Sequence, residues 1–406
     1  MKVLQINAVY GRKSTGKIVE EIKLVLENEG HEAYVAGPFE LNKNIHGYKV
    51  GNTIDWKLHA LLTRVTGKQS FYSRFATKQF LKYLGAVKPD IIHLHNIHAN
   101  FLNLPLLIEY MRNQGIGLVI TLHDSWYFTG KCFHFADIGC GKYQIDCKTC
   151  PKKMLEVPTF FKDNAWWCYR QKKELFASIA NKKIIGCSQW IASLAKQSFF
   201  NEEDVDYIYN GINTEVFRLQ DKISIRRNKG FENEFVILGM ANKWELRENE
   251  TTIKNLFQHY SQSNTIFLIV GCRLEAKKRF EELADGYDVK LRLVEYIQSS
   301  DELAEYYSSA DVFVNLTHVD TLPTVNMESI CCGTPVVTYN SGGSPELILP
   351  GCGFTVNKDE CSALIEAIED SRALDSANIA EEGKKAFSAQ LNFKKYLEVY
   401  SSLMND

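Results

Sequence analysis

Asp320 and Glu328 lie on either side of a predicted helix start. The preceding residues, 310–315, are apolar and β-branched, and they predict a buried parallel strand. A helix is expected over residues 325–332, after Pro323. Asp320 therefore falls in the loop after the strand and Glu328 inside the helix. Both lie near the carboxyl end of a strand, where open α/β sheets bind ligands.

The residue types in this stretch suit a ligand that carries hydroxyls and phosphates. A carboxylate such as Glu328 can accept hydrogen bonds from both hydroxyls of a ribose. Backbone amides at a helix start can hold a phosphate, and Gly342 with Gly343 would let the backbone approach a ligand closely. The other candidate ligand contacts here are Leu322, Pro323 and Thr324. The alternative is that each of these is an ordinary helix or turn residue.

Together these motifs resemble the donor site of the retaining GT-B glycosyltransferases of family 4. The resemblance rests on the spacing between Asp320 and Glu328, on the run CGTPVV at 332–337 and on GGSPE at 342–346. Asp320 replaces the usual glutamate, as in the capsular and colanic-acid branches of that family. The likeness to those polysaccharide enzymes extends over nearly the whole chain.

The resemblance implies a hexosyltransferase-type enzyme with retention at the anomeric carbon. Such an enzyme moves a sugar from a nucleotide diphosphate sugar to a glycan or lipid-linked glycan acceptor in surface or capsular polysaccharide biosynthesis. No metal or other cofactor is required for that catalysis. The implied fold is α/β of the GT-B type, with two Rossmann-like doubly wound parallel-sheet domains facing a central cleft.

Two alternatives to this function remain open. A nucleotide-sugar epimerase shares the two-domain fold, but it needs a carboxylate pair that the N-terminal half does not clearly provide. A non-catalytic nucleotide-sugar-binding subunit would tolerate departures from the donor motif.

The composition fits a globular protein with two domains. The chain has 406 residues, of which 45% are hydrophobic and 24% charged, and this length allows two cores. A net charge of −2 gives no reason to expect nucleic acid as a partner. No apolar run reaches the roughly 20 residues of a membrane span. We therefore expect a cytoplasmic protein, with peripheral binding to the inner face of the cell membrane as an open addition.

Alternating strands and helices predict the doubly wound sheets and their boundaries. We assign residues 1–213 to a Rossmann-like acceptor domain and residues 214–384 to a Rossmann-like donor domain. A last helix, at about 385–406, is expected to cross back onto the first domain, because its apolar residues have the spacing to pack there. These residues are Phe393, Tyr396, Leu397 and Tyr400.

A glycine-bounded basic loop, residues 11–17, follows the first predicted strand and leads into a helix expected from about Ile18. The spacing nearly matches a phosphate-binding P-loop, but Ile18 stands where that motif needs Ser or Thr for magnesium. In the family resembled, this loop lies against donor and acceptor. That likeness makes Thr15 and Gly16 candidate substrate contacts.

Four histidines fall at or near predicted strand ends, and they are His93, His95, His98 and His123. Histidines in this position could hold a metal, or they could simply face a polar cleft. In the family resembled, the histidine at the position of His123 contacts the transferred sugar, and this role is carried over to His123.

Lys243 and Arg247 occupy the place of the basic pair that grips the donor diphosphate in the family resembled. The usual lysine next to the arginine is Glu248 here, and the glycine after it is Asn249. A carboxylate next to a diphosphate repels it. We therefore expect Glu248 either to point away or to weaken donor binding.

The segment 56–89 contains seven Lys or Arg residues and no Asp or Glu. Aromatic side chains alternate with the basic ones, as in helices that lie on anionic lipid. The equally open alternative is a solvated helix face above a stripe of core residues.

Four of the eleven cysteines cluster in a loop after the predicted strand that ends at His123, and they are Cys132, Cys140, Cys147 and Cys150. Four thiolates can bind a structural zinc in tetrahedral geometry, and the last two form a C-x2-C pair. The alternative is four free thiols. Zinc bound in this way would have no open position for chemistry.

Overall fold

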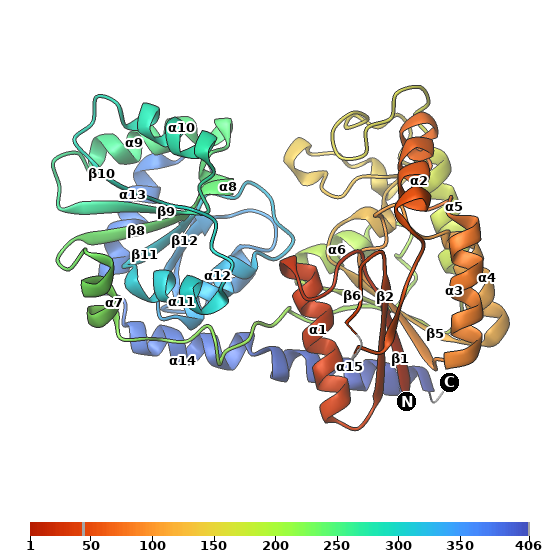
Figure 1. Ribbon diagram of the computed structural model, residues 1–406. Coiled ribbons are helices and arrows are strands. Elements are labelled where there is room, and N and C mark those ends of the chain that lie inside the picture. The colour runs from red at the N-terminus through yellow and green to blue at the C-terminus, as the bar shows by residue number, and fades with distance from the viewer. Residues whose placement is uncertain (43–44, 405–406) are drawn as a thin grey trace. The chain divides into compact units, whose positions relative to one another are not determined.

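The computed structural model describes residues 1–42 and 45–404. The chain forms two compact units, residues 1–210 together with the segment from Gln390 onward, and residues 211–389. Each unit contains one parallel sheet with helices around it (Figure 1). The predicted α/β class with two doubly wound parallel sheets is confirmed.

The sheet of the first unit has the strand order β3-β2-β1-β4-β5-β6-β7. Its strands are β1 (Lys2–Ile6), β2 (Glu32–Gly37), β3 (Gly47–Lys49), β4 (Ile91–Leu94), β5 (Gly117–Leu122), β6 (Lys182–Gly186) and β7 (Val205–Tyr207). Its helices are α1 (Lys13–Asn28), α2 (Thr53–Thr66), α3 (Arg74–Val87), α4 (Leu104–Gln114), α5 (Ala165–Ala177) and α6 (Gln189–Lys196). Strands β4 and β5 are buried along their whole length, as strands covered on both faces must be.

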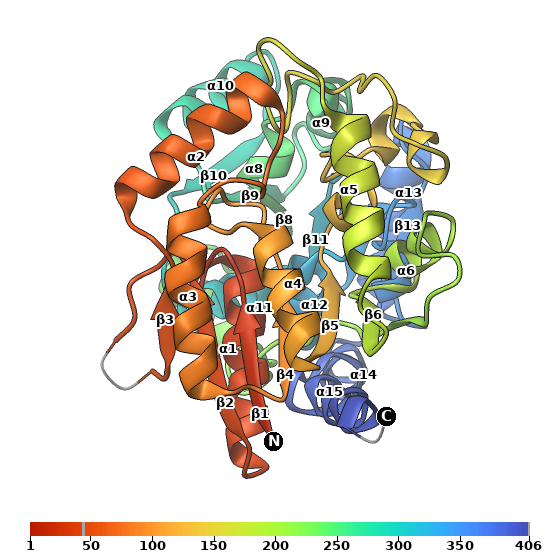
Figure 2. The same cartoon turned by 90° about the vertical axis from the view of Figure 1, so that its right-hand side faces the viewer.

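Local signals set the ends of several helices in the first unit. Asn52 and Asp55 form a capping box at the start of α2, and Gly67 ends that helix with φ of +71°. Asn103 caps α4 by accepting a hydrogen bond from the amide of Leu106. In Figure 2, α3 and α4 lie next to each other in front of the sheet.

The sheet of the second unit has the order β10-β9-β8-β11-β12-β13. Its strands are β8 (Phe235–Met240), β9 (Thr265–Val270), β10 (Lys290–Val294), β11 (Val312–Asn315), β12 (Val336–Tyr339) and β13 (Gly353–Val356). Its helices are α7 (Lys222–Lys229), α8 (Ala241–Trp244), α9 (Glu250–His259), α10 (Leu274–Ala284), α11 (Ser300–Ser309), α12 (Thr324–Cys331), α13 (Cys361–Asp370) and α14 (Ser376–Phe387). The core on one face of this sheet includes Trp244, Phe257, Phe267 and Phe280.

Some element boundaries differ from those expected. Helix α1 begins at Lys13 rather than near Ile18, so the basic loop 11–17 is mostly the first turn of the helix. The sequence of residues 217–233 predicts a link into the second domain, but this segment contains α7. The last helix, expected at about 385–406, begins at Ala389, because the helix before it ends at Phe387 and Ser388 is extended.

Helix α15 (Ala389–Met404) packs on the sheet of the first unit. Tyr400 and Tyr396 are both buried, and their hydroxyls lie 2.8 Å from His93 Nδ1 and 2.7 Å from Thr121 Oγ1. At the end of α15, the carbonyl of Leu403 accepts a hydrogen bond from Asn181 Nδ2. Within the described ranges, no helix combines the length and apolar character needed to cross a membrane.

Candidate functional site

The loop after β11 is held by its own backbone and by the glycine turn at 342–343. Asp320 Oδ1 accepts a hydrogen bond from the amide of Leu322 (3.2 Å), and the carbonyl of Asp320 accepts one from Gly343 (2.9 Å). Gly342 has φ of +59°, and a Cβ there would come within 2.2 Å of the Asp320 carbonyl oxygen. Gly342 therefore lets the turn pack closely against the Asp320 loop.

Lys243, at the end of α8, reaches the same loop. Its Nζ lies 3.8 Å from Asp320 Oδ2, and the two side chains are 29% and 33% exposed. The adjacent Trp244 is fully buried and donates a hydrogen bond to the carbonyl of Val314 in β11 (2.9 Å), which attaches α8 to that strand. The fold thus brings a predicted cation and a predicted carboxylate from separate motifs next to each other.

Glu248 and Asn249 tie α8 to the loop after β11. Glu248 Oε1 lies 3.1 Å from Nδ1 of His318. Asn249 is buried; its Nδ2 donates to the carbonyls of Lys243 and Leu316, and its Oδ1 accepts from His318 Nε2 (2.7 Å). Both departures from the family pattern therefore belong to one hydrogen-bond network in which the Glu248 carboxylate contacts an imidazole.

Arg247 and His318 flank this network. Arg247 is exposed at the start of the short turn 247–249, where it interacts electrostatically with Glu250. Burial lowers the pKa of His318, against the opposing effect of Glu248. The predicted basic pair is thus split into a half-buried Lys243 beside Asp320 and an exposed Arg247.

Glu328 projects from α12 toward a buried tyrosine. Its Oε2 accepts a hydrogen bond from Tyr307 of α11 (3.1 Å), and burial together with Glu328 raises the pKa of Tyr307 well above its usual value. Pro323 precedes the first helical residue, Thr324, and no side chain in the described part of the chain caps this helix start. Leu322 and Pro323 are buried, while Thr324 is partly exposed.

Two buried hydroxyls next to Asp320 have no hydrogen-bond partner among the described residues. They are Thr321 Oγ1 and Ser344 Oγ, and their residues are 3% and 0% exposed. Buried polar groups in folded proteins nearly always have a hydrogen-bond partner, so each of these two hydroxyls needs an explanation. A polar ligand bound at the Asp320 loop would provide it.

In the first unit, a chain of hydrogen bonds fixes the proton positions on His95 and His123. Gln5 Nε2 donates to the carbonyl of Val19 (3.1 Å), which leaves Gln5 Oε1 to accept from His95 Nε2 (3.1 Å). His95 Nδ1 must then accept from His123 Nε2 (3.0 Å). His123 Nδ1 consequently carries a lone pair.

That Nδ1 atom of His123 is buried and has no partner within residues 1–42 and 45–404. Burial lowers the pKa of His123 to about 4, so the ring is neutral near pH 7. A neutral imidazole with an unpaired lone pair can accept a hydrogen bond from a ligand hydroxyl. This geometry suits the sugar contact expected of His123.

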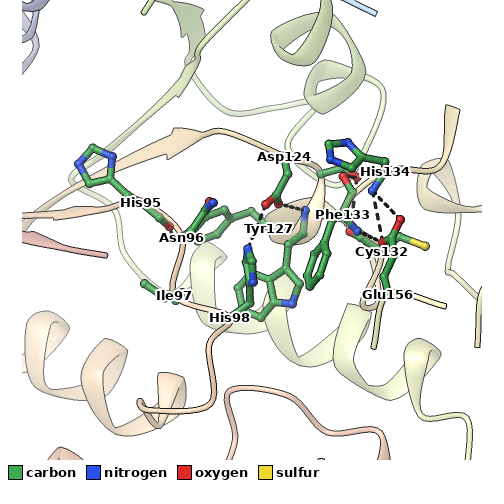
Figure 3. Close-up of polar contacts among 12 residues, drawn as sticks. His95, Asn96, Ile97, His98, Asp124, Tyr127, Cys132, Phe133, His134 and Glu156 are labelled. Carbon is green, nitrogen blue, oxygen red and sulfur yellow. Dashed lines mark hydrogen bonds and ion pairs between the residues drawn. The ribbon is translucent and has the colours of Figure 1, made fainter. Parts of the chain in front are cut away.

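His98 and His93 have other partners. His98 Nε2 lies 3.0 Å from Asp124 Oδ2, and the amide of Trp126 donates a hydrogen bond to Asp124 Oδ1 (2.8 Å). Figure 3 shows the Asp124–His98 pair, with His95 at a distance from it. His93 contacts Thr121 and Tyr400. In the part of the chain that the structure describes, no three His, Cys, Asp or Glu side chains are already arranged to hold a metal.

Thr15 and Gly16 lie in the first turn of α1, at the carboxyl end of β1. Gly16 is buried, and its carbonyl accepts a hydrogen bond from the amide of Gly11 (3.0 Å). Among the described residues, no side chain caps the start of α1, and amides at such a helix start can bind a ligand.

The four clustered cysteines are free thiols in the segment between β5 and α5. They line one pocket, and Cys132 Sγ lies 4.0 Å from Cys150 Sγ.

Several residues of these sites were not found from the sequence. Gln5, Tyr307 and His318 act through partners far away along the chain, and none of them belongs to a motif. Ser344 lies inside the recognised GGSPE motif and Thr321 borders Asp320, but a hydroxyl in a loop carries no pattern that distinguishes it from any other.

Two family models match the chain. The model "Glycosyltransferase Family 4" matches residues 16–216, and the model "Glycosyl transferases group 1" matches residues 221–386. Among curated proteins, the chain is 24% identical to a putative colanic acid biosynthesis glycosyl transferase, WcaC, of Escherichia coli K12, over 78% of this chain and 77% of that protein. It is 30% identical to the uncharacterized glycosyltransferase MJ1607 of Methanocaldococcus jannaschii, over 66% of this chain and 62% of that protein.

Solved structures share the fold. A glycosyltransferase from Rickettsia africae ESF-5 superposes with a TM-score of 0.69 and 14% identity, covering 100% of this chain and 99% of that one. Anabaena Alr3699/HepE in complex with UDP-glucose gives a TM-score of 0.67 and 15% identity, covering 99% and 100%. The two matched models, the relatives and the fold together identify the chain as a glycosyltransferase of group 1, family 4, with the GT-B fold.

Proposed function

We propose that this enzyme is a retaining glycosyltransferase that transfers a sugar from a nucleotide diphosphate sugar to a glycan or lipid-linked glycan of a surface polysaccharide. The contact between Lys243 and Asp320 carries the proposal, because it places a cation and a carboxylate at the carboxyl end of β11. Two relatives support the substrate classes. Alr3699/HepE was solved with UDP-glucose and with UDP, and WcaC is named for colanic acid biosynthesis.

In this proposal, Glu328 and Lys243 bind different parts of the donor. Glu328 accepts the ribose hydroxyls, with Tyr307 holding the carboxylate in place. Lys243, Arg247 and the uncapped start of α12 stabilise the negative charge that grows on the departing diphosphate. Thr321 and Ser344 supply hydroxyls that the ligand would satisfy.

Retention follows from attack on the same face of the sugar that the diphosphate leaves. The bond from the anomeric carbon to the phosphate oxygen breaks, and the bond to the acceptor oxygen forms. The acceptor proton passes to the leaving phosphate. His123 holds a hydroxyl of the transferred sugar through its unprotonated Nδ1, and no step requires a metal ion.

A donor panel tests the proposal. Free UDP, GDP and ADP are first compared by thermal shift, and the sugars of the base that stabilises the protein are then incubated with candidate acceptors. We expect transfer from an α-linked donor to give an α-linked product by NMR. A β-linked product would contradict retention, nucleotide binding without transfer would favour a binding subunit, and an isomerised donor would favour an epimerase.

We also propose that the first unit binds an anionic membrane surface, where a lipid-linked acceptor would be found. The outer face of α2 carries four exposed aliphatic side chains at helical spacing, Ile54, Leu58, Leu61 and Val65, which are 77%, 54%, 56% and 38% exposed. Lys57 and Arg64 are exposed on the same helix. An apolar stripe with basic residues next to it suits an interface of headgroups and acyl chains.

Residues beyond α2 extend this apolar surface. The amide of Phe160 donates to the carbonyl of Arg64 at the end of α2 (2.8 Å), and Phe160 and Phe161 are 56% and 74% exposed. The aromatic residues expected to face lipid mostly do not: Phe80 is fully buried, and Trp56 donates to the carbonyl of Val50. The proposed membrane contact is therefore aliphatic on α2, rather than the aromatic face that the sequence suggested.

A further inference from the structure

The loop that joins β5 to α5 has little regular structure to hold its shape. Within residues 129–164, the secondary structure consists of two short 3-10 turns, 136–138 and 142–144. Six large apolar side chains of this loop are exposed, namely Ile138, Ile145, Met154, Leu155, Phe160 and Phe161. The loop buries Phe135, Tyr143 and Val157 but leaves these six exposed, so a cross-link or a metal would add to its stability.

Four cysteines of this loop lie around one pocket. Cys132, Cys140, Cys147 and Cys150 all belong to the lining of this pocket. Cys147 interacts electrostatically with Cys140 and Cys150, and Cys132 with Cys147 and Cys150. The loop therefore brings all four cysteines to the lining of one pocket, although they span nineteen residues of sequence.

The spacing of the closest pair matches a zinc site. Tetrahedral zinc with zinc–sulfur bonds of about 2.3 Å sets its sulfurs roughly 3.8 Å apart. Cys132 Sγ and Cys150 Sγ are 4.0 Å apart. Backbone amides of Gly130 and Lys152 donate to the sulfurs of Cys147 and Cys150, as amides commonly do toward metal-bound thiolates. Cys140 and Cys147 would have to move closer to complete the shell.

Two buried lysines supply an independent observation. Lys131 and Lys172 are 2% and 0% exposed and lie beside the thiols. Lys131 Nζ contacts two carbonyls and the hydroxyl of Thr159, and Lys172 Nζ contacts the carbonyl and the ring of Trp126. Neither forms an ion pair with a carboxylate of the described residues. Buried cations need a counter-charge.

We propose that Cys132, Cys140, Cys147 and Cys150 bind one structural Zn²⁺ as four thiolates. Each thiol releases its proton to solvent on binding, so the centre carries a net charge of −2. The two buried ammonium groups of Lys131 and Lys172 balance this charge. Because four protein ligands fill the tetrahedron, the ion takes no part in chemistry.

The zinc would fix the loop that covers the end of β5. The amide of Ser125 donates to the carbonyl of Phe133 (2.9 Å), and the Glu156 carboxylate accepts from the amides of Phe133 and His134, so the chain around Cys132 is tied to the residues after His123 (Figure 3). Loss of the metal should therefore loosen the surroundings of His123 and Asp124.

Metal analysis of the full chain tests the proposal. Protein purified under reducing conditions without chelator should contain about one zinc per chain. Cys140→Ser and Cys147→Ser should each lower that content several-fold, whereas Cys361→Ser, which removes a half-buried thiol of the second unit, should leave it unchanged. Cobalt added to metal-free wild-type protein should give the visible absorption of a tetrahedral thiolate site.

A second measurement uses only the wild-type protein, so it does not depend on whether the cysteine variants fold. In the wild-type protein, alkylation followed by mass spectrometry should find these four thiols protected, and a strong chelator should expose them. The proposal is overturned if the reduced protein contains no zinc, takes up neither zinc nor cobalt, and has all four thiols reactive. A disulfide between Cys132 and Cys150, seen as a mass loss of about 2 Da, would overturn it equally.

Discussion

At the scale of single residues, Glu328 and Lys243 have different tasks in the proposed mechanism, and their substitution should affect different measurements. Glu328 contributes to binding of the nucleotide in any state of the reaction. Lys243 contributes most when the sugar–phosphate bond is breaking, because the charge it opposes is largest at that point. Binding and turnover can therefore be separated.

Glu328→Gln keeps the shape of the side chain but loses the charge that strengthens its bonds to the ribose hydroxyls. We expect binding of the free nucleoside diphosphate to weaken by about 1.5 to 3 kcal/mol. Calorimetry with the cognate nucleotide measures this. Glu366→Gln, on an exposed position of α13, is the control and should bind normally. Unchanged affinity in Glu328→Gln would place the ribose elsewhere.

Lys243→Ala should reduce turnover by about 10²-fold or more and reduce donor affinity much less, because the lost charge acts mainly on the transition state. Steady-state kinetics on both substrates gives the two values. Lys254→Ala removes a lysine that pairs with Glu250 on α9 and should behave like the wild type. Near-normal turnover in Lys243→Ala would exclude it from the leaving-group site.

Only those site residues that belong to a recognisable motif could be predicted from the sequence. The spacing of Asp320 and Glu328 and the bounds of α12 follow from local patterns, whereas the hydrogen bonds from Gln5 through His95 to His123 join three separate segments. Residue spacing does not reveal such partners. The contact between Glu248 and His318 could not be predicted for the same reason, because the two residues lie in separate segments of the chain.

At the scale of elements, fully buried strands were the most predictable part of the fold. Runs such as β5 and β9 contain mostly apolar or β-branched residues, so burial on both faces is visible in the sequence. Strand β3 was missed because its three residues are only half-buried and have no such run. The start of α1 was misplaced because polar residues without a capping side chain form its first turn.

Helix α2 gives a prediction about membrane binding. The wild-type protein should sediment with vesicles that contain anionic lipid, less so at high salt. The double variant Leu58→Gln, Leu61→Gln should weaken binding because apolar contact with the lipid is lost. Replacing Lys57, Arg64, Arg74 and Lys78 by Gln should weaken binding by about 1 kcal/mol for each charge removed. Lys68, another basic residue of the segment 56–89, is not substituted, because its Nζ lies 4.0 Å from the centre of the Trp167 ring.

Lys278→Gln with Lys384→Gln is the matched control for membrane binding, since both lysines are exposed in the second unit. This variant should bind as the wild type does. Equal sedimentation of all variants, or no binding at any salt concentration, would contradict a lipid-binding role for α2.

At the scale of the whole molecule, α15 belongs in sequence to the end of the chain and in structure to the first unit. The hydroxyl of Tyr400 forms a hydrogen bond with His93 Nδ1 in β4, and the hydroxyl of Tyr396 forms one with Thr121 Oγ1 in β5. All four side chains are buried, so the sheet depends on α15 for these polar contacts.

Tyr400→Phe should destabilise the first unit by about 1 to 3 kcal/mol, because it leaves His93 Nδ1 buried without a partner. Hydrogen exchange followed by mass spectrometry should show faster exchange in peptides from β4 and β5 and no change in peptides from β9 and β12. Tyr296→Phe, at a side chain 77% exposed, should change neither set. Equal exchange in wild type and Tyr400→Phe would mean that the helix does not stabilise these strands.

The position of α15 also bears on how the chain is made. Domains usually fold in the order of synthesis, as each leaves the ribosome. Here His93 and Tyr400 are separated by 307 positions, and the whole second unit is translated between them. The first unit to emerge must therefore wait with two polar side chains uncovered on its central strands, and it completes its core only after the second unit has emerged.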